Sequence, residues 1–521
     1  MKLAAIDIGS NSIHLIIAHI HRDGTWTVVD RGKDMVGLAS HTLANGYLSE
    51  QALARGLECL HTFKRMADAQ GTDAIVAVAT SAVREAANAE HFITLARTEC
   101  DIDVRVISGK EEARLIYLGA RNHIDWADRK ALIVDIGGGS VEFIVGSRDH
   151  AEMFASLKLG VRRLGEEFLQ SDPPTRTQLK ALSAHVETAL GKFTRKLADR
   201  HPFDFVVGTS GTLSNLALMG ALKEGTHPVG SHGQWANLAT LKLMARELSG
   251  MTLEQRKGYP GLDPKRRDTI VPGAQLTKYI LRAVGRDSYV CCDYALRDGL
   301  VVDYIETHGP GRRTSDDLPD LRRRSVLALY RKFNQSGAHP RQVSQLALSL
   351  FDQLQPIHLL AERGRETLEH AALLHDIGLA ISQRSHHNHS HYLIIHGELH
   401  GFSREEIHRI ALVARYHRQQ PPRKKHRAMA ELVAPDRRRV RILAAILRLA
   451  NALDRSHANN VSGLQCRLTN DTVHIDIFTH SDPALELWAA EDNCATLERA
   501  LRRKIVVVAL PAQQLTMPWA L

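Results

Sequence analysis

Two short stretches of the sequence repeat the same arrangement of aspartate, glycine and serine. They are AAIDIGSNSIHLIIA around Asp7 and LIVDIGGGSVEFIVG around Asp135, and they align without a gap. Each has apolar residues before the aspartate, a turn rich in glycine and serine, and apolar residues after the turn. The pattern predicts a strand, a tight polar turn and a second strand, present twice.

Turns of this composition suit phosphate, because glycine lets backbone N–H groups approach an anion closely. An aspartate at the start of such a turn would repel phosphate unless a divalent cation lay between them. A single Asp-x-Gly turn is more often part of an ordinary hairpin, so the duplication carries the prediction. The repeat therefore predicts bound Mg²⁺ or Mn²⁺ and a phosphate-binding set composed of Gly9, Ser10, Asn11, Ser12, Gly137, Gly138, Gly139 and Ser140.

The elements around the repeat indicate an α/β fold. Up to about residue 305, short apolar strands alternate with segments of helical periodicity. Two similar turns that grip one polyphosphate favour two lobes facing each other across a cleft. We therefore expect a first lobe at residues 1–125, a second lobe at 126–306 and a linker at 307–324, where Gly, Pro, Ser and charges interrupt any apolar period.

The rest of the chain has a different pattern. Residues 325–460 repeat apolar side chains every three or four positions, which predicts an all-α domain. Residues 461–521 begin with two alternating segments around a polar turn and end with the apolar run KIVVVAL, which predicts a small α+β domain.

Composition narrows the function classes. With 44% hydrophobic and 24% charged residues, the chain has an ordinary globular composition, and a formal net charge of +9 favours a polyanionic partner. The six cysteines form no C-x-x-C pair, Asp7 interrupts the apolar amino terminus, and no uncharged run has the apolar density of a membrane helix. We expect a cytoplasmic protein that contacts no membrane and does not have nucleic acid as its partner.

Four stretches carry a resemblance to a known family. They are DIGSNSIH from Asp7, TSAVREA from Thr80, ISGKEEARLIYLGA from Ile107 and DIGGGSVEF from Asp135, with GTSGT from Gly208 as a supporting fifth. In this order they resemble the exopolyphosphatase and guanosine pentaphosphate phosphohydrolase (Ppx/GppA) family, over about residues 1–305. The resemblance implies two actin-like (ribonuclease H-like) lobes, followed in long members by a helical domain and a tail, and it implies a homodimer.

The resemblance also implies roles for single residues. Glu112 would be the general base that deprotonates the attacking water, and Arg84 would clamp a phosphate. The cation would be bound by Asp135 and Glu142 with help from Asp7, and GTSGT would bind phosphate through Gly208, Thr209 and Ser210. In the related sequences, a glutamate usually stands at the position of Asp298.

The two acids of KEEARL also fit a plain helix start. Ser108 and Glu111 have the spacing of a capping box, and acidic side chains are favourable in a first helical turn. This alternative explains one acid well and leaves the other without a purpose. We assign Glu111 to the cap and Glu112 to the chemistry.

The function that follows is metal-assisted hydrolysis of the terminal phosphoanhydride of inorganic polyphosphate, with release of phosphate. Guanosine pentaphosphate is the alternative substrate, which would connect the protein to the stringent response. A sensor that closes on a nucleotide without turnover is a further alternative. A long polyanion needs successive positive charges, and the candidates are Lys158, Arg162, Arg163, Arg266 and Arg267.

The helical domain has its own candidate metal site. His339, the adjacent His375 and Asp376, and Asp454 resemble the metal-binding set of the HD phosphohydrolase superfamily, and imidazole with carboxylate suits a divalent ion. The chain has 29 histidines, so each of these could also be an ordinary core or surface histidine. We assign the run that includes His386 to a polar loop and helix start, and His417 is a candidate additional ligand. Hydrolysis at this second site is another alternative function.

Overall fold

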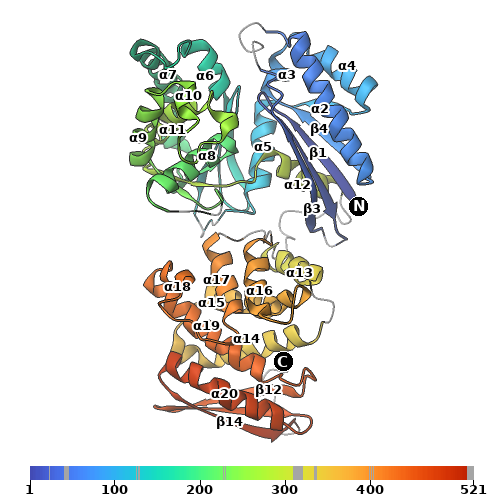
Figure 1. The fold of residues 1–521 in the computed structure, drawn as a ribbon, viewed down its shortest axis with the longest axis vertical. Helices are drawn as coiled ribbons and strands as arrows, with labels where there is room; N and C mark the ends of the chain where they lie inside the picture. The colour runs from blue at the N-terminus through green and yellow to red at the C-terminus, as the bar shows by residue number, and fades with distance from the viewer. Residues whose placement is uncertain are drawn as a thin grey trace. The chain divides into compact units, whose positions relative to one another are not determined.

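The computed structural model describes residues 1–22, 24–39, 46–124, 126, 129–226, 228, 230–308, 321–333, 337–397, 399, 402 and 404–512. The chain forms two compact units, Met1–Leu318 and Pro319–Leu521, and each is described by itself (Figure 1). Residues 309–320, which make up most of the predicted linker, and residues 513–521 lie outside the described residues.

The first sheet of the amino-terminal unit contains the first copy of the repeat. Its strand order is β3-β2-β1-β4-β5; β2 is antiparallel to β1 and β3, whereas β4 is parallel to β1 and β5. Ala4 and Ile6 of β1 pack under the helices, and Leu3 and Ala5 point to the opposite face. The strands are β1 (Lys2–Ile8), β2 (Ile13–Ile20), β3 (Trp26–Asp34), β4 (Ala74–Ala79) and β5 (Val104–Val106), and the helices are α2 (Glu50–Ala69), α3 (Ser81–Glu85) and α4 (Ala89–Cys100).

The second sheet contains the second copy and follows the same plan. Its order is β10-β11-β9-β6-β7-β8; β7 is antiparallel to β6 and β8, and β9 is parallel to β6 and β11. The strands are β6 (Ala131–Ile136), β7 (Val141–Gly146), β8 (Ala151–Leu157), β9 (Phe205–Thr209), β10 (Trp235–Asn237) and β11 (Ser288–Cys291). The helices are α6 (Val161–Phe168), α7 (Arg176–Arg200), α8 (Ser210–Lys223), α9 (Leu238–Ser249), α10 (Leu253–Arg256) and α11 (Ile270–Ala283), with the 3₁₀ turn η1 (Pro264–Arg266). The two sheets confirm the predicted α/β fold.

Two helices share a core with both sheets. Residues of α5 (Gly109–Ala120) and α12 (Leu296–His308) pack with Ala5 of β1 and Ile133 of β6 in one hydrophobic cluster. The two helices approach closely at a glycine pair: a Cβ on Gly119 would lie 2.1 Å from the Ala295 carbonyl oxygen, and a Cβ on Gly299 would lie 1.8 Å from the Leu115 carbonyl oxygen. Glycine at both positions therefore fixes α5, which carries Glu112, against α12.

The carboxy-terminal unit begins with helices and ends with a small sheet. The helices are α13 (Leu321–Phe333), α14 (His339–His358), α15 (Glu362–Leu374), α16 (His386–Ile395), α17 (Arg404–Arg415), α18 (Arg427–Ala430) and α19 (Ala434–Ala452), with the 3₁₀ turn η3 (Ile377–Ala380). The sheet contains β12 (Val461–Leu468), β13 (Thr472–Thr479) and β14 (Lys504–Pro511), and α20 (Ala484–Leu501) connects the last two strands. Side chains from the helices and from the sheet belong to one hydrophobic cluster. The unit is thus held together by a single core.

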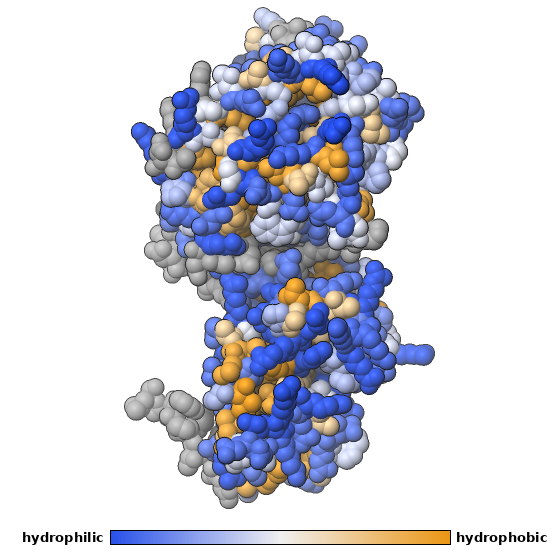
Figure 2. Space-filling view, turned by 90° about the vertical axis from the view of Figure 1, so that its left-hand side faces the viewer, coloured by the Kyte–Doolittle hydropathy of each residue, from blue (hydrophilic) through white to orange (hydrophobic). Residues whose placement is uncertain are grey.

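One face of each unit is visible in a space-filling view. On the face shown in Figure 2, hydrophilic side chains predominate and hydrophobic ones occur as separate patches. Within the described part of the chain, none of the helices combines the length and the apolar character needed to span a membrane.

Candidate active site

A row of polar side chains crosses the second sheet at the turn of the second hairpin. Asp135 on β6 is the register partner of Glu142 on β7 and of Thr209 on β9, and Glu142 is the partner of Ser156 on β8. Register partners project from the same face of a sheet. Thr209 Oγ1 donates to Asp135 Oδ2 at 2.6 Å, and Ser156 Oγ donates to Glu142 Oε1 at 2.8 Å. The seven-residue spacing of the motif thus places two carboxylates side by side.

The first hairpin has a corresponding row. Asp7 on β1 is the partner of His14 on β2, which is in turn the partner of Lys33 on β3. His14 Nε2 lies 2.8 Å from Ser12 Oγ, and a nitrogen of Arg297 lies 3.3 Å from His14 Nδ1. The first hairpin therefore places an imidazole opposite its aspartate, where the second places a carboxylate.

Both turns close in the same way. The Gly9 N–H donates to the Ser12 carbonyl at 3.1 Å, and the Gly137 N–H donates to the Ser140 carbonyl at 3.0 Å. Ser140 is 3% exposed. The identical backbone bonds show that the sequence repeat is also a structural repeat.

The two turns also touch each other. The hydroxyls of Ser10 and Ser81 lie 2.8 Å apart. A Cβ on Gly139 would lie 2.2 Å from Ser81 Oγ, and a Cβ on Gly138 would lie 3.0 Å from Ser10 Cβ. Because side chains at these two glycines would push the turns apart, glycine keeps the two cradles in contact.

Glu112 lies in the first turn of α5. Ser108 caps this helix by accepting the Glu111 N–H at 3.2 Å, but the Glu111 carboxylate binds Arg114 at 2.8 and 2.9 Å instead of completing a capping box. Glu112 is 7% exposed, and its Oε2 accepts a hydrogen bond from Arg84 Nη1 at 2.9 Å. Arg84 also donates to a backbone carbonyl at 2.9 Å, so the predicted phosphate clamp orients the predicted base.

Burial and like charges raise the pKa of the carboxyls in this site. Burial and the charges of Glu112 and Asp135 raise the pKa of Asp7 to about 8. Burial raises the pKa of Glu112 to about 7, although Arg84 opposes the shift, and burial raises the pKa of Asp135 to about 6. The pKa of Glu142 is well above its ordinary value because of burial and the charges of Glu112 and Asp135. Such mutual perturbation is typical of a catalytic centre.

The donor set fits a hard divalent cation. Asp7 Oδ1 and Glu142 Oε2 are buried and accept no hydrogen bond from any residue that the structure describes. Carboxylate oxygens are the ligands that Mg²⁺ and Mn²⁺ prefer. A cation bound there would offset the negative charge of the carboxylates of Asp7, Asp135 and Glu142.

Residues 16–308 match the Ppx/GppA phosphatase family, and residues 321–492 match domain III of Ppx/GppA phosphatases. The chain belongs to the Ppx/GppA phosphatase family. Its membership confirms that it is a hydrolase acting on phosphoanhydride bonds, as the motifs predict.

Related proteins match about three fifths of this family member. Exopolyphosphatase 1 of Mycobacterium tuberculosis is 31% identical over 312 residues, which is 60% of this chain and 90% of that protein, and Exopolyphosphatase 1 of Mycobacterium leprae is 30% identical. The crystal structure of an exopolyphosphatase from Cytophaga hutchinsonii matches with a TM-score of 0.55 at 27% identity, over 60% of this chain and 100% of that one. An exopolyphosphatase-like protein matches with a TM-score of 0.53 at 29% identity, over 58% and 97% of the two chains.

The GTSGT segment of this Ppx/GppA protein begins at the end of β9, the strand parallel to β6, and phosphate binding by its residues stays a prediction. The Thr209 side chain is fully buried and donates to Asp135, so its hydroxyl positions that carboxylate. A Cβ on Gly208 would lie 2.6 Å from the Tyr289 ring, so this glycine makes room for the ring. Ser210 has a φ of 79°, and its buried hydroxyl has no hydrogen-bond partner among the described residues. Of the hydroxyls of Thr209 and Ser210, only that of Ser210 has no hydrogen-bond partner within the described part of the chain.

Most of the predicted polyanion channel is already paired. Lys158 lies 2.8 Å from Glu85, and Arg163 binds both oxygens of the same carboxylate at 2.9 Å. Arg267 donates to a backbone carbonyl at 2.8 Å. Arg162 donates to the side chain of Asn11 in the first turn, and Arg163 donates to the Gly139 carbonyl in the second turn at 3.1 Å, so both contact predicted phosphate-binding residues. The charges of Lys158 and Arg163 are offset by Glu85, which the sequence places more than 70 residues away.

The site also contains Asp298, to which no role was assigned, and Arg266, which was predicted only as one of several positive charges for the polyanion. Asp298 on α12 is 1% exposed, its Oδ2 accepts the Ala295 N–H at 3.1 Å, and its charge contributes to the raised pKa of Asp7. Arg266 lies over the GTSGT turn, because a Cβ on Gly211 would lie 1.7 Å from its guanidinium. The departure from glutamate in ALRDGL was a signal for Asp298, whereas no signal in the sequence distinguished Arg266 from Arg267.

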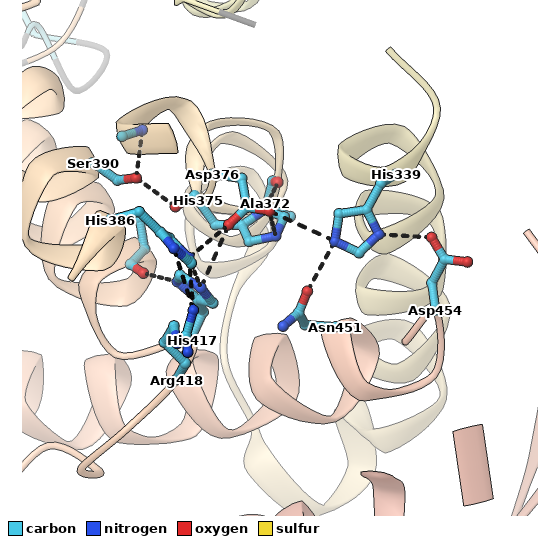
Figure 3. Close-up of polar contacts among 12 residues, drawn as sticks. His339, Ala372, His375, Asp376, His386, Ser390, His417, Arg418, Asn451 and Asp454 are labelled. Atoms are coloured by element: carbon cyan, nitrogen blue, oxygen red, sulfur yellow. Dashed lines mark hydrogen bonds and ion pairs between the residues drawn. The ribbon is translucent and has the colours of Figure 1, made fainter. Parts of the chain in front are cut away.

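A second cluster lies in the carboxy-terminal unit (Figure 3). His339 Nδ1 lies 2.7 Å from Asp454 Oδ2, and His339 Nε2 lies 3.1 Å from Asn451 Oδ1. Burial lowers the pKa of His375, which keeps its imidazole neutral. His386, which was assigned to a polar loop and helix start, is the first residue of α16. It is 5% exposed, so its side chain is buried in the cluster.

Proposed function

We propose that this protein is an exopolyphosphatase that removes the terminal phosphate of inorganic polyphosphate at the site formed by the two hairpins and α5. The observation that carries the proposal is the position of Glu112, which is buried, bound to Arg84 and electrostatically coupled to Asp135. A carboxyl with a pKa near 7 can take a proton from water at neutral pH and release it afterwards.

Glu112 performs the proton transfer in this reaction. A water oxygen attacks the terminal phosphorus, the P–O bond to the shortened chain breaks, and the water proton passes to the Glu112 carboxylate. Arg84 orients the accepting oxygen and keeps the pKa of Glu112 from rising further. The leaving phosphate oxygen keeps the electron pair of the broken bond, so charge and atoms balance.

Asp135, Glu142 and Asp7 would hold the divalent cation. A cation bound there offsets the negative charge of the transferring phosphoryl group and of its leaving group. Thr209 and Ser156 fix the orientation of the two carboxylates of the second hairpin, as the hydrogen bonds at 2.6 and 2.8 Å indicate. Backbone N–H groups of the two turns would bind the phosphate oxygens.

The substrate is assigned to polyphosphate because relatives that match 60% of this chain are called exopolyphosphatases and because basic side chains lie near the first hairpin. Lys33, Arg266 and Arg297 are close enough to His14 to lower its pKa. Guanosine pentaphosphate has the same terminal phosphoanhydride and remains the alternative substrate. The homodimer also remains a prediction.

Phosphate release from long-chain polyphosphate and from guanosine pentaphosphate, measured for the wild type beside Glu112→Gln, tests the proposal. We expect faster release from polyphosphate in the wild type and a loss of turnover of at least about a hundredfold in the variant, because glutamine cannot accept the proton.

Glu111→Gln is the matched control. Its side chain binds Arg114 on the surface of the same helix, so activity should change by no more than about twofold. Full activity of Glu112→Gln would refute the assigned base, and faster turnover of guanosine pentaphosphate would refute the assigned substrate.

A further inference from the structure

Glu85 forms ion pairs between the two parts of the amino-terminal unit that contain the two sheets. It lies on α3, which follows β4 of the first sheet, whereas Lys158 and Arg163 follow β8 of the second sheet. Nζ of Lys158 lies 2.8 Å from Oε2 of Glu85, and Nη2 of Arg163 lies 2.9 Å from each oxygen of the Glu85 carboxylate. One carboxylate from the first part thus binds two cations from the second.

These ion pairs lie next to residues of the proposed active site. Arg84, the preceding residue of α3, binds Glu112. Nε of Arg163 donates to the Gly139 carbonyl of the second hairpin turn at 3.1 Å. The guanidinium of Arg163 therefore contacts both the second turn and Glu85.

Exposure to solvent increases from Arg163 to Lys158. The Arg163 side chain is 15% exposed and the Glu85 side chain is 21% exposed, whereas the Lys158 side chain is 71% exposed. Arg163 and Lys158 thus form a row of positive charge that begins at the second turn and ends at the surface. The Glu85 carboxylate interrupts this row.

Glu85 carries a negative charge at neutral pH. Burial raises its pKa, but the hydrogen bonds and charges of Lys158 and Arg163 outweigh burial and lower the pKa of Glu85 below its ordinary value. One carboxylate with two cations leaves a net positive charge in this group. Carboxylate and phosphate oxygens accept the same charge-assisted hydrogen bonds from arginine and lysine, so a phosphate group can replace the carboxylate.

We propose that Glu85 limits the affinity of the enzyme for polyphosphate by occupying the two cations that bind the phosphate groups next to the terminal one. This role rests on the proposed function, since it needs a polyphosphate chain whose end lies in the two hairpin turns. The chain displaces the Glu85 carboxylate, which turns toward solvent, and Lys158 and Arg163 then bind phosphate oxygens. No covalent bond changes in this exchange.

The exchange favours long substrates over the product. Displacement of Glu85 breaks two ion pairs, and a ligand replaces them only when it has further phosphate groups linked to the one held in the turns. A single phosphate in the turns has no such groups. Glu85 therefore stays paired with Lys158 and Arg163 when only the product is bound.

Calorimetric titration of the full-length protein with long-chain polyphosphate tests the proposal. The titration is done in EDTA, without the divalent ions that the proposed hydrolysis needs, so that binding is measured without turnover. Glu85→Gln should bind polyphosphate about fivefold more tightly than the wild type, because the uncharged amide competes poorly for the two cations. A carboxylate that only held the fold together would give weaker binding after the same substitution.

Glu90→Gln is the matched control. Glu90 is an exposed carboxylate of the neighbouring helix α4, and its substitution changes the net charge of the protein by the same amount. Its affinity for polyphosphate should stay within about twofold of the wild-type affinity, since solvent and salt screen an exposed charge. A gain as large as that of Glu85→Gln would show that net charge alone explains the effect and would overturn the role of Glu85.

Lys158→Gln supplies an independent test on an exposed side chain. Because Glu85 occupies Lys158 in the wild type, Lys158→Gln should weaken polyphosphate binding more in the Glu85→Gln background than in the wild type. Thermal unfolding establishes that each variant is folded. Equal or weaker binding by Glu85→Gln, or an effect of Lys158→Gln that is the same in both backgrounds, would overturn the role of Glu85. Absence of phosphate release from polyphosphate by the wild type with Mg²⁺ would instead refute the proposed function.

Discussion

The two hairpins of the amino-terminal unit share a backbone and differ in charge. In both, a glycine N–H binds the carbonyl of the serine three residues later, and the aspartate faces the residue seven positions later in register. That residue is His14 in the first hairpin and Glu142 in the second.

The charged neighbours of His14 and Glu142 also differ in sign between the two hairpins. Burial, Arg297 and Lys33 lower the pKa of His14 to about 3, whereas burial, Glu112 and Asp135 raise the pKa of Glu142. The duplication thus supplies two equivalent backbone cradles, and one register position with its neighbours sets the charge beside each. The second hairpin suits a cation, and the first suits the polyanion.

The largest effect should come from removing a carboxylate of the second hairpin. Glu142→Gln deletes one charge beside Asp135, and we expect Mg²⁺ to bind more than about a hundredfold more weakly, since even the partners of metal ligands contribute up to that factor. The measurement is the Mg²⁺ concentration that gives half-maximal phosphate release.

His14→Gln is the control on the equivalent position of the first hairpin. It should leave this Mg²⁺ concentration unchanged, because the neutral imidazole of His14 adds no charge to the cation site. An equal weakening by both substitutions would contradict the division between the hairpins.

A smaller loss of Mg²⁺ affinity is expected from a change at Thr209, which lies on β9 beside Asp135 in the row of polar side chains of the second sheet. Thr209→Val removes the hydroxyl that donates to Asp135 Oδ2 at 2.6 Å, and we expect Mg²⁺ affinity to fall about tenfold. Thr277→Val is the control, since the hydroxyl of this buried threonine binds a backbone carbonyl within α11. If Thr209→Val kept wild-type affinity, the hydroxyl would have no part in positioning the carboxylate.

The chemistry of the repeat could be predicted from sequence because it depends on local spacing. Asp135 and Glu142 lie seven residues apart across a four-residue turn, so hairpin register alone brings them together. The same spacing identifies Asp7 as the equivalent residue. A strand–turn–strand motif thus determines both its own backbone and the side chains that share a face.

The residues that escaped prediction depend on packing between distant segments. Glu85 forms an ion pair with Arg163, which lies 78 positions later in the sequence, and this pair offsets the positive charge of Arg163. His386 meets Asp376 because Gly378 permits a close approach of α16, and charge or periodicity in the sequence does not encode that contact. Such pairings are set by the tertiary fold.

The smallest effect, and the finest test of the two hairpins, is the pH dependence of folding in metal-free protein. Asp135 has a folded-state pKa of about 6 against 3.8, so the stability that its proton contributes is present at low pH and is lost as pH rises through 6. His14 has a folded-state pKa of about 3 against 6.5, so stability is lost as pH falls below 6.5, where the unfolded chain takes up a proton.

Between pH 5 and pH 8, the free energy of unfolding of Asp135→Asn should therefore increase by about 1–2 kcal/mol relative to that of the wild type as pH rises. The free energy of unfolding of His14→Gln should increase by a similar amount relative to the wild type as pH falls. Urea unfolding at the two pH values measures both differences, and a change of the same sign in the two variants would show that the hairpins do not differ in charge environment.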